Sequence, residues 1–377
     1  MAPSGPLPTG VFLLSLTAFL ICCRVNSMVS LSDPSAIALT GVAVLLGLFA
    51  AAYVQSQGTA SHDPLYYGFA VFAFTGVVDL IIWLEQDGYI CGFMEFYMRE
   101  GEPYLRTSYG IIVCLWDGTV HYLLYLAIAS AIIGRRSYRS LDLYWLGCLM
   151  MTLLVLLPGN VIGKFGTELR LSFLLNVACV LLPIWAGMRM FREPRTTVYN
   201  SAEKAAEEQR RGLLLHPLDL ALMLYLVIAV GFPLFRGLVV LDCPSDCGFD
   251  YIYQYESYLK DPVVYPKMQM LVSMFYALPV FCLCMYGLVQ PSCTWMLDWT
   301  LVLTGAIAQA QFSHVGASLH RRTPYTYGVP AENWWLFLVA NVLYALGPHL
   351  LAYRCLRRTG FFVSTAPGVQ DSDKKQK

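Results

Sequence analysis

Ionisable side chains interrupt several long apolar segments of this 377-residue sequence. They are Asp79, Asp117, His121, Arg236 and His349. A charge at the centre of a membrane helix costs about 2.5–3.5 kcal/mol on insertion scales, so each should face a partner or a wet cavity. Asp117 and His121 stand four residues apart on one helix face, so together they could hold a proton or grip a hydroxyl group.

Two asparagines, Asn176 and Asn341, occupy similar apolar surroundings. One interpretation of all these polar residues is a pocket between helices that receives a ligand. The simpler alternative is that each residue hydrogen-bonds a neighbouring helix, which is the commoner use of polar groups in a membrane bundle. Spacing alone leaves both open.

Several chemistries are disfavoured by absent patterns. The sequence has no clustered histidine box for a di-iron centre, no glycine-rich phosphate loop and no serine nucleophile elbow, so we predict no metal and no cofactor. His314 and His320 are too far apart to favour a shared metal, and we expect them at the membrane interface. Basic and acidic residues balance at 25 each, so nucleic acid is not an expected partner.

The composition indicates a membrane protein. Hydrophobic residues make up 57% and charged residues 13%, where a soluble domain carries about 25% charged residues. Apolar runs of roughly 20 residues match the thickness of a bilayer. They lie at Val11–Val29, Ile37–Val54, Leu65–Leu84, Tyr109–Ile133, Leu143–Ile162, Leu171–Met190, Leu218–Leu241, Met268–Val289, Leu297–Phe312 and Trp334–Leu356. The fold class is therefore all-α and polytopic with about ten transmembrane helices, the ninth being the least apolar.

The last eight segments form an internal repeat. Pro64-Leu65 precedes Glu102-Pro-Tyr104-Leu105 by 38 residues, and Pro217-Leu218 precedes Glu256-Ser-Tyr258-Leu259 by 39. Asn176 with Pro183, and Asn341 with Pro348, close the two copies. We therefore predict an N-terminal helix pair (1–60), a first four-helix unit (61–191), a linker (192–213), a second unit (214–356) and a tail (357–377). Each unit has an even number of helices, so the two copies are parallel rather than inverted.

The arginine and lysine distribution predicts the orientation. Ten helices put both termini on one side, and that side holds 15 of the 25 basic residues, so both termini should be cytosolic. Cys243 and Cys247 would then face an oxidising lumen and could form a disulfide. The first segment lacks a secretory cleavage pattern and should be retained.

The C-terminal residues Lys374-Lys375-Gln376-Lys377 resemble a dilysine retrieval signal of endoplasmic reticulum membrane proteins. A solvated basic tail is the simpler alternative.

Several longer segments resemble the transmembrane 6 superfamily. They are Phe69–Thr75, Asp79–Ile82, Gly101–Arg106, Trp116–Tyr122, Phe235–Pro244 and Ala308–His314. Two more, Phe93–Tyr97 and Tyr344–Tyr353, are more similar to the member 2 branch than to the member 1 branch. The resemblance runs nearly end to end.

The resemblance implies that each four-helix unit is an EXPERA domain, related to the emopamil-binding sterol isomerase and the sigma-2 receptor. It further implies a protein of the endoplasmic reticulum and the ER–Golgi intermediate compartment. There it would govern neutral lipid and lipid droplet content and the lipidation and secretion of triglyceride-rich lipoproteins. No reaction is implied.

Comparison with the isomerase adds further candidates. The isomerase carries a His-x3-Glu pair, a Glu seven residues before a Trp, and an Asn with Trp three residues later. This chain places Asp79 and Trp83 at the first pair, Tyr109 before Trp116 and Gln269 before Tyr276 at the second, and Cys179 and Tyr344 after the two asparagines. Because the acid that would protonate a sterol is missing from this pattern, we expect no isomerase activity.

Three hypotheses follow. The first is a non-catalytic protein that binds a membrane lipid or sterol through Asp79, Asp117, His121 and Asn176 in one unit and Arg236, Gln269 and Asn341 in the other. The second is a residual lipid-modifying enzyme that uses the same residues. The third is a scaffold for lipoprotein assembly proteins that acts through its loops, especially the acidic segment from Glu85 to Glu102.

Overall fold

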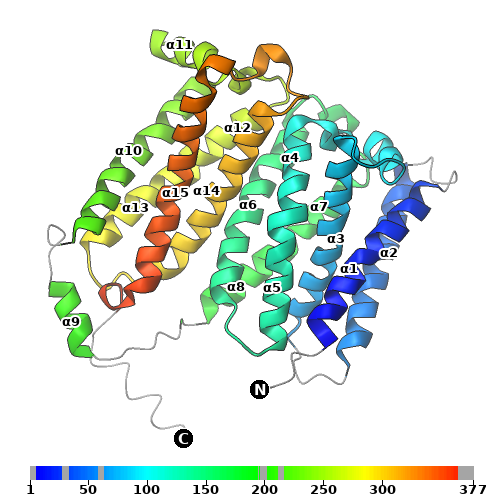
Figure 1. Cartoon of the computed structure of the whole chain (residues 1–377), viewed down its shortest axis with the longest axis horizontal. Coiled ribbons are helices and arrows are strands. Elements are labelled where there is room, and N and C mark those ends of the chain that lie inside the picture. The colour runs from blue at the N-terminus through cyan, green and yellow to red at the C-terminus, as the bar shows by residue number, and fades with distance from the viewer. Residues whose placement is uncertain are drawn as a thin grey trace, which may run out of the picture.

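The computed structural model describes residues 6–27, 34–57, 63–193, 195, 202–210 and 216–363, and within these ranges it contains helices and loops but no strand. The first half comprises α1 (Pro6–Asn26), α2 (Pro34–Ser56), α3 (Leu65–Gln86), α4 (Ser108–Trp116), α5 (Tyr122–Ile133), α6 (Arg139–Ile162), α7 (Phe173–Cys179) and α8 (Leu181–Arg192). The second comprises α9 (Ala202–Arg210), α10 (Pro217–Val240), α11 (Asp246–Gln254), α12 (Tyr265–Val272), α13 (Leu278–Val289), α14 (Met296–Leu319) and α15 (Trp334–Arg357). These elements confirm the all-α class (Figure 1).

Nine stretches of the described chain are long and apolar enough to cross a membrane, counting α4–α5, α7–α8 and α12–α13 as one crossing each. The remaining predicted segment corresponds to α14, which is not among these nine; α14 has 24 residues and runs through the centre of the molecule. Most of α14 is buried by other helices, so it can carry Gln309, Gln311 and Ser313 where a lipid-facing helix could not. The start of α1 and the end of α15 lie at the same end of the bundle (Figure 1).

The two four-helix units share local irregularities as well as helix order. In each unit the second crossing is widened by a π turn, η4 (Asp117–His121) between α4 and α5 and η8 (Ser273–Ala277) between α12 and α13. In each, a short 3₁₀ turn directly follows the repeated glutamate, η3 (Pro103–Arg106) after Glu102 and η7 (Ser257–Lys260) after Glu256. The structure thus repeats the features that the sequence repeats.

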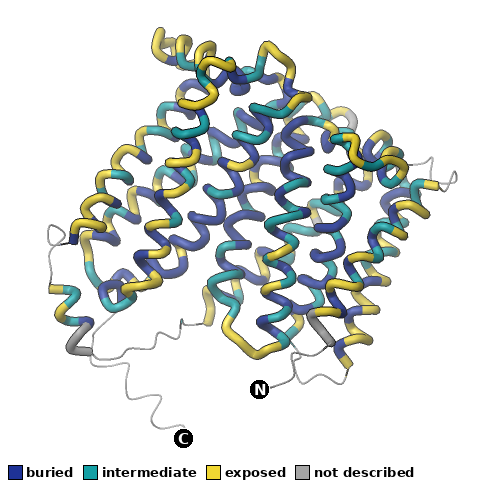
Figure 2. The backbone as a smooth tube through the Cα atoms, viewed as in Figure 1, coloured by how far each residue is buried: buried dark blue, intermediate teal, exposed yellow. Residues whose placement is uncertain are grey.

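The N-terminal helix pair packs against the first unit. Helix α1 lies along α3 and α5, and α2 also contacts α3. The Ser15 hydroxyl is 3.0 Å from the Tyr122 hydroxyl, and the rings of Phe19 and Phe93 meet edge to face at 6.1 Å. The outer sides of α1 and α2 are exposed, whereas the central helices are mostly buried (Figure 2).

The two units meet where α6 crosses α14. A Cβ atom on Gly147 would lie 2.0 Å from the carbonyl oxygen of Val302, and one on Gly305 would lie 2.0 Å from that of Tyr144. The two backbones are therefore in direct contact, as small residues allow in membrane bundles. Next to this crossing, Asp298 at the start of α14 accepts two hydrogen bonds from Arg139 of α6.

The segments after α8 and after α15 also contact the bundle. Arg195 donates to Asp298 at 2.8 Å. The segment predicted as a linker contains α9, whose Gln209 donates to the carbonyl oxygens of Gly360 and Val363 just beyond α15. Cys243 and Cys247 are exposed free thiols in the structure, so the proposed disulfide stays a prediction. Lys374 and Lys375 lie outside the described residues.

We predict that Gly147→Ala and Gly305→Ala each lower the melting temperature of the purified protein by several degrees. The added Cβ forces the two backbones apart, and overpacking of this kind typically costs about 1–3 kcal/mol. Thermal unfolding in detergent, followed by size-exclusion chromatography, measures the effect. Gly231→Ala on α10, where a Cβ would contact nothing within 4 Å, is the control and should not lower the melting temperature. Equal stability in all three variants would contradict the close crossing.

Candidate functional site

A cavity of about 270 Å³ opens inside the first unit. Its walls come from helices α1 to α7, including the π turn η4, and from the segment between α3 and α4. Most of the lining is aliphatic or aromatic, including Val44, Phe72, Ile82, Leu153 and Leu175. The N-terminal helices thus complete a pocket that the four-helix unit alone would leave open.

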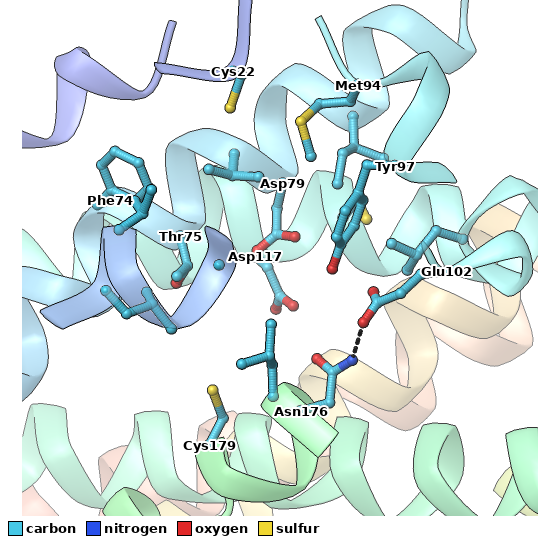
Figure 3. A pocket seen from close by; sticks show the side chains of 18 of the residues that line it. Cys22, Phe74, Thr75, Asp79, Met94, Tyr97, Glu102, Asp117, Asn176 and Cys179 are labelled. Carbon is cyan, nitrogen blue, oxygen red and sulfur yellow. Dashed lines mark hydrogen bonds between the residues drawn. The ribbon is translucent and has the colours of Figure 1, made fainter. Parts of the chain in front are cut away.

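Polar groups converge on one part of the cavity. The carboxylates of Asp79 and Asp117 point into the same space, and Glu102 and Asn176 face it from the opposite side (Figure 3). The Tyr97 hydroxyl also points inward. Among the described residues, those that line the cavity include these three acids but no lysine, arginine or histidine. The cavity therefore combines a long apolar wall with a cluster of oxygen acceptors.

The π turn positions Asp117. It begins at Asp117, and the adjacent Gly118 lets it approach α3, because a Cβ there would lie 2.7 Å from the Cα of Leu80. His121 closes the turn, with Nδ1 2.7 Å from Asp117 Oδ1 and no exposed side-chain surface. The predicted pairing of Asp117 and His121 is therefore present, with the aspartate lining the cavity and the histidine behind it. Such π turns are frequent at functional sites.

Glu102 reaches the cavity from the segment that follows α3. Its Oε1 accepts a hydrogen bond of 2.6 Å from Asn176 Nδ2, which also donates to the Tyr104 hydroxyl at 2.8 Å. Burial raises the pKa of Glu102 from 4.5 to about 7, although hydrogen bonds with Tyr104, Tyr97 and Asn176 pull it down. Glu102 can therefore exist in either protonation state near neutral pH.

The segment between α3 and α4 is held in place by buried polar contacts. Glu85, near the end of α3, accepts hydrogen bonds from the backbone amides of Phe93 and Met94, at 2.9 and 2.6 Å. The Asn26 side chain at the end of α1 accepts one from the Phe96 amide. Two of the acidic segment's carboxylates, Glu85 and Glu102, are thus directed inward, away from any partner protein.

The second unit holds a related polar cluster. Arg236 of α10 donates to Glu256, to the Asn341 side-chain oxygen at 2.9 Å and to the Tyr251 hydroxyl at 3.1 Å. His314 of α14 is fully buried, with Nε2 3.6 Å from Glu256. His314 is thus part of the protein core, and its expected position at the membrane interface stays a prediction.

Other candidates lie away from the cavity. Tyr109 stacks on Tyr265 of the second unit with ring centroids 4.7 Å apart, and Trp116 packs against Phe312 of α14 at 5.0 Å. Gln269 donates to the Ala310 carbonyl oxygen at 2.6 Å. Each of the three contacts joins two helices. This is the simpler alternative, in which polar residues bind neighbouring helices and not a ligand.

Two more residues of the second half also contact neighbouring side chains. The Tyr344 ring packs on Phe232 and Phe281. His349 lies 3.4 Å from the Tyr144 hydroxyl of α6. The structure thus brings Asp79, Asp117 and Asn176 together at the cavity, and Arg236 with Asn341 in the second cluster.

The site residues that sequence reasoning missed are Glu102 and Tyr97. The sequence marks Glu102 as part of the repeat and as the end of the acidic segment, but not as a residue of the cavity. Because a glutamate recurs in both units with an asparagine three predicted membrane segments later, the two side chains could have been predicted to pair. Tyr97 carries no comparable signal, because its position depends on how the segment after α3 folds back.

Comparison with known proteins agrees with this architecture. Residues 17–201 match the family "Transmembrane 6 superfamily member 2-like, transmembrane domain", and residues 250–355 match "EXPERA (EXPanded EBP superfamily)". Transmembrane 6 superfamily member 2 of Homo sapiens is 56% identical over 362 residues, 96% of each chain. The chain belongs to the transmembrane 6 superfamily. The rat and mouse proteins of the same name are 54% and 53% identical, over 98% of this chain and 99% of theirs.

The transmembrane 6 superfamily resemblance proposed from sequence, including the member 2 branch, is thereby confirmed. The EXPERA match lies within the second unit; it begins inside α11, runs to α15 and leaves out α10. No solved structure matches the chain.

We predict that Glu102→Gln changes how stability depends on pH. Because the folded pKa of Glu102 is raised, its protonated form favours folding below pH 4.5, and this contribution is lost as pH rises towards 7. Relative to Glu102→Gln, the wild-type protein should lose on the order of 2–3 kcal/mol of stability between pH 4.5 and 7.5. Melting temperatures of the wild type and of Glu102→Gln, recorded across this pH range, measure the difference in stability. The nearby exposed Glu95→Gln is the control, and parallel curves for wild type and Glu102→Gln would contradict the assignment.

Proposed function

We propose that this protein binds one membrane lipid or sterol in the cavity of its first four-helix unit, without chemical conversion. The observation that carries the proposal is the cavity itself, which has apolar walls and a polar cluster at Asp79, Asp117, Glu102 and Asn176. Ligand pockets are typically apolar with a few convergent polar groups. A lipid with an apolar body and one polar group would match this arrangement, with its body against the apolar walls and its polar group at the cluster.

The polar cluster favours a ligand that donates hydrogen bonds. Carboxylate oxygens accept, and the Asn176 amide already donates to Glu102 and Tyr104. A hydroxyl such as that of a sterol or a diacylglycerol would donate to Asp79 or Asp117. An anionic lipid headgroup would be repelled, since the part of the chain that the structure describes contributes three acids and no basic residue to the cavity lining.

In the cell, this binding would serve lipid metabolism at the endoplasmic reticulum and the intermediate compartment before the Golgi. We propose that it supports lipidation and secretion of triglyceride-rich lipoproteins and sets neutral lipid content, with lipoprotein assembly proteins as partners. Both termini would lie on one side of the membrane, which is supported by the common end at which α1 begins and α15 ends, and the excess of arginine and lysine on that side favours the cytosol. The C-terminal dilysine would then be available to a cytosolic retrieval receptor.

The proposal is tested by mass spectrometry of lipids that co-purify in mild detergent. Asp117→Asn should retain about tenfold less of a specific lipid, because a hydrogen bond to a charged group contributes about 1.5 kcal/mol. Thr75→Leu, which adds bulk to the cavity wall without changing charge, should reduce retention as well. Asp250→Asn on the exposed face of α11 is the matched control. Only bulk phospholipid in every sample would instead favour the scaffold hypothesis.

A sterol isomerase-like enzyme is a second candidate, favoured by one observation. The sequence comparison suggested that the proton-donating acid was lost, but Glu102 places a buried carboxyl at the cavity near Asp79 and Asp117. Closely placed carboxyls could hold and transfer a proton. Incubating the purified protein with a panel of unsaturated sterols distinguishes the candidates. We expect binding without product, whereas product that disappears in Glu102→Gln would establish the enzyme.

A further inference from the structure

The repeat places a glutamate and an asparagine at matching positions in each unit, and the two pairs have different hydrogen-bond partners. In the first unit Glu102 and Asn176 bond directly to each other beside the cavity. In the second, the guanidinium of Arg236 lies between Glu256 and Asn341 and donates to both through Nη2. A side chain of the protein therefore occupies the space between the glutamate and the asparagine in the second unit.

The surroundings of Arg236 are those of a bound cation. Its side chain is 2% exposed, as is that of Glu256. Besides Glu256 and Asn341, Nε donates to the Tyr251 hydroxyl, and the guanidinium carbon lies 3.9 Å from the centre of the Phe232 ring. Carboxylate, amide, phenol and aromatic face together satisfy a planar cation on several sides.

We infer that Arg236 is a built-in occupant that closes the second unit to lipid, so that the chain carries a single lipid site, in its first unit. The part concerning lipid number rests on the proposed function, whereas the occupancy by Arg236 does not. Arg236 is then the residue that makes the two copies of the repeat different. It converts a site of the kind seen at Glu102 and Asn176 into a contact that joins α10, α11 and α15.

An arginine that only joined helices would show similar bonds, so the distinguishing feature is what happens to lipid. If the second unit were open, changes at Arg236 or Asn341 would alter the lipid bound there. If it is closed, these changes affect stability while the lipid in the first unit remains. The position of Arg354, buried and paired with Asp219 in the same unit, provides a matched control.

The first experiment counts lipids by native mass spectrometry. We expect one specific lipid per chain in the wild type and in Asn341→Ala, and none in Thr75→Leu. Two lipids in the wild type, or loss of lipid in Asn341→Ala with retention in Thr75→Leu, would overturn the inference. A wild type without any specific lipid would refute the proposed function and, with it, the part of the inference that concerns lipid number. The second experiment then tests the occupancy by Arg236 by itself.

The second experiment tests the occupancy by chemical rescue. Arg236→Ala should melt several degrees below the wild type, and millimolar ethylguanidinium should restore part of the loss by filling the vacated position. Neither the wild type nor Asp250→Asn should be stabilised. Arg354→Ala should be destabilised but keep its lipid. If Arg236→Ala does not fold, Arg236→Lys replaces it, with the expectation of a lower melting temperature and an unchanged lipid count. The inference would be contradicted if Arg236→Ala melted at the wild-type temperature, or if ethylguanidinium did not raise its melting temperature.

Discussion

The backbone contact between α6 and α14 is the constraint on which the rest of the structure depends. Gly147 and Gly305 let the two helices touch, and the carbonyl oxygens of Val302 and Tyr144 leave no room for a side chain there. Helices α4 and α6 of the first unit and α13 and α15 of the second all contact α14, so α14 is surrounded by protein. That burial explains why this helix can carry glutamines, a histidine and serines. It also leaves the opposite face of the first unit to be covered by α1 and α2, which is where the cavity forms.

Within this frame, the two units have diverged around the same polar pair. A buried glutamate cannot be left without partners in a low-dielectric interior, because its desolvation would go uncompensated. The first unit satisfies Glu102 with neutral donors and remains open beside it, whereas the second uses the charge of Arg236. The repeated architecture therefore accommodates both an open pocket and a closed, charge-paired core.

Much of the fold could be predicted from the sequence because membrane helices are marked by length and hydropathy, and the recurrence of Pro-Leu, Glu-x-Tyr-Leu and Asn-x6-Pro indicated the repeat. Asp79, Asp117 and Asn176 could be predicted because polar groups in apolar segments must face something. The contacts of Tyr109 and Trp116 could not be predicted, since they depend on how the two units pack against each other. Arg236 was expected to line a pocket, and its contacts with Glu256 and Asn341 depend on the packing of three helices.

The central claim is that a lipid occupies the first unit and not the second, and a cryo-electron microscopy map of the protein purified with native lipid tests it most directly. The account predicts an elongated density between α1, α2, α3 and α7 that ends within hydrogen-bonding distance of Asp79 or Asp117. In the second unit, side-chain density for Arg236 should fill the space between Glu256 and Asn341. Lipid density confined to the outer surface of the helices, or present beside Asn341, would contradict the account.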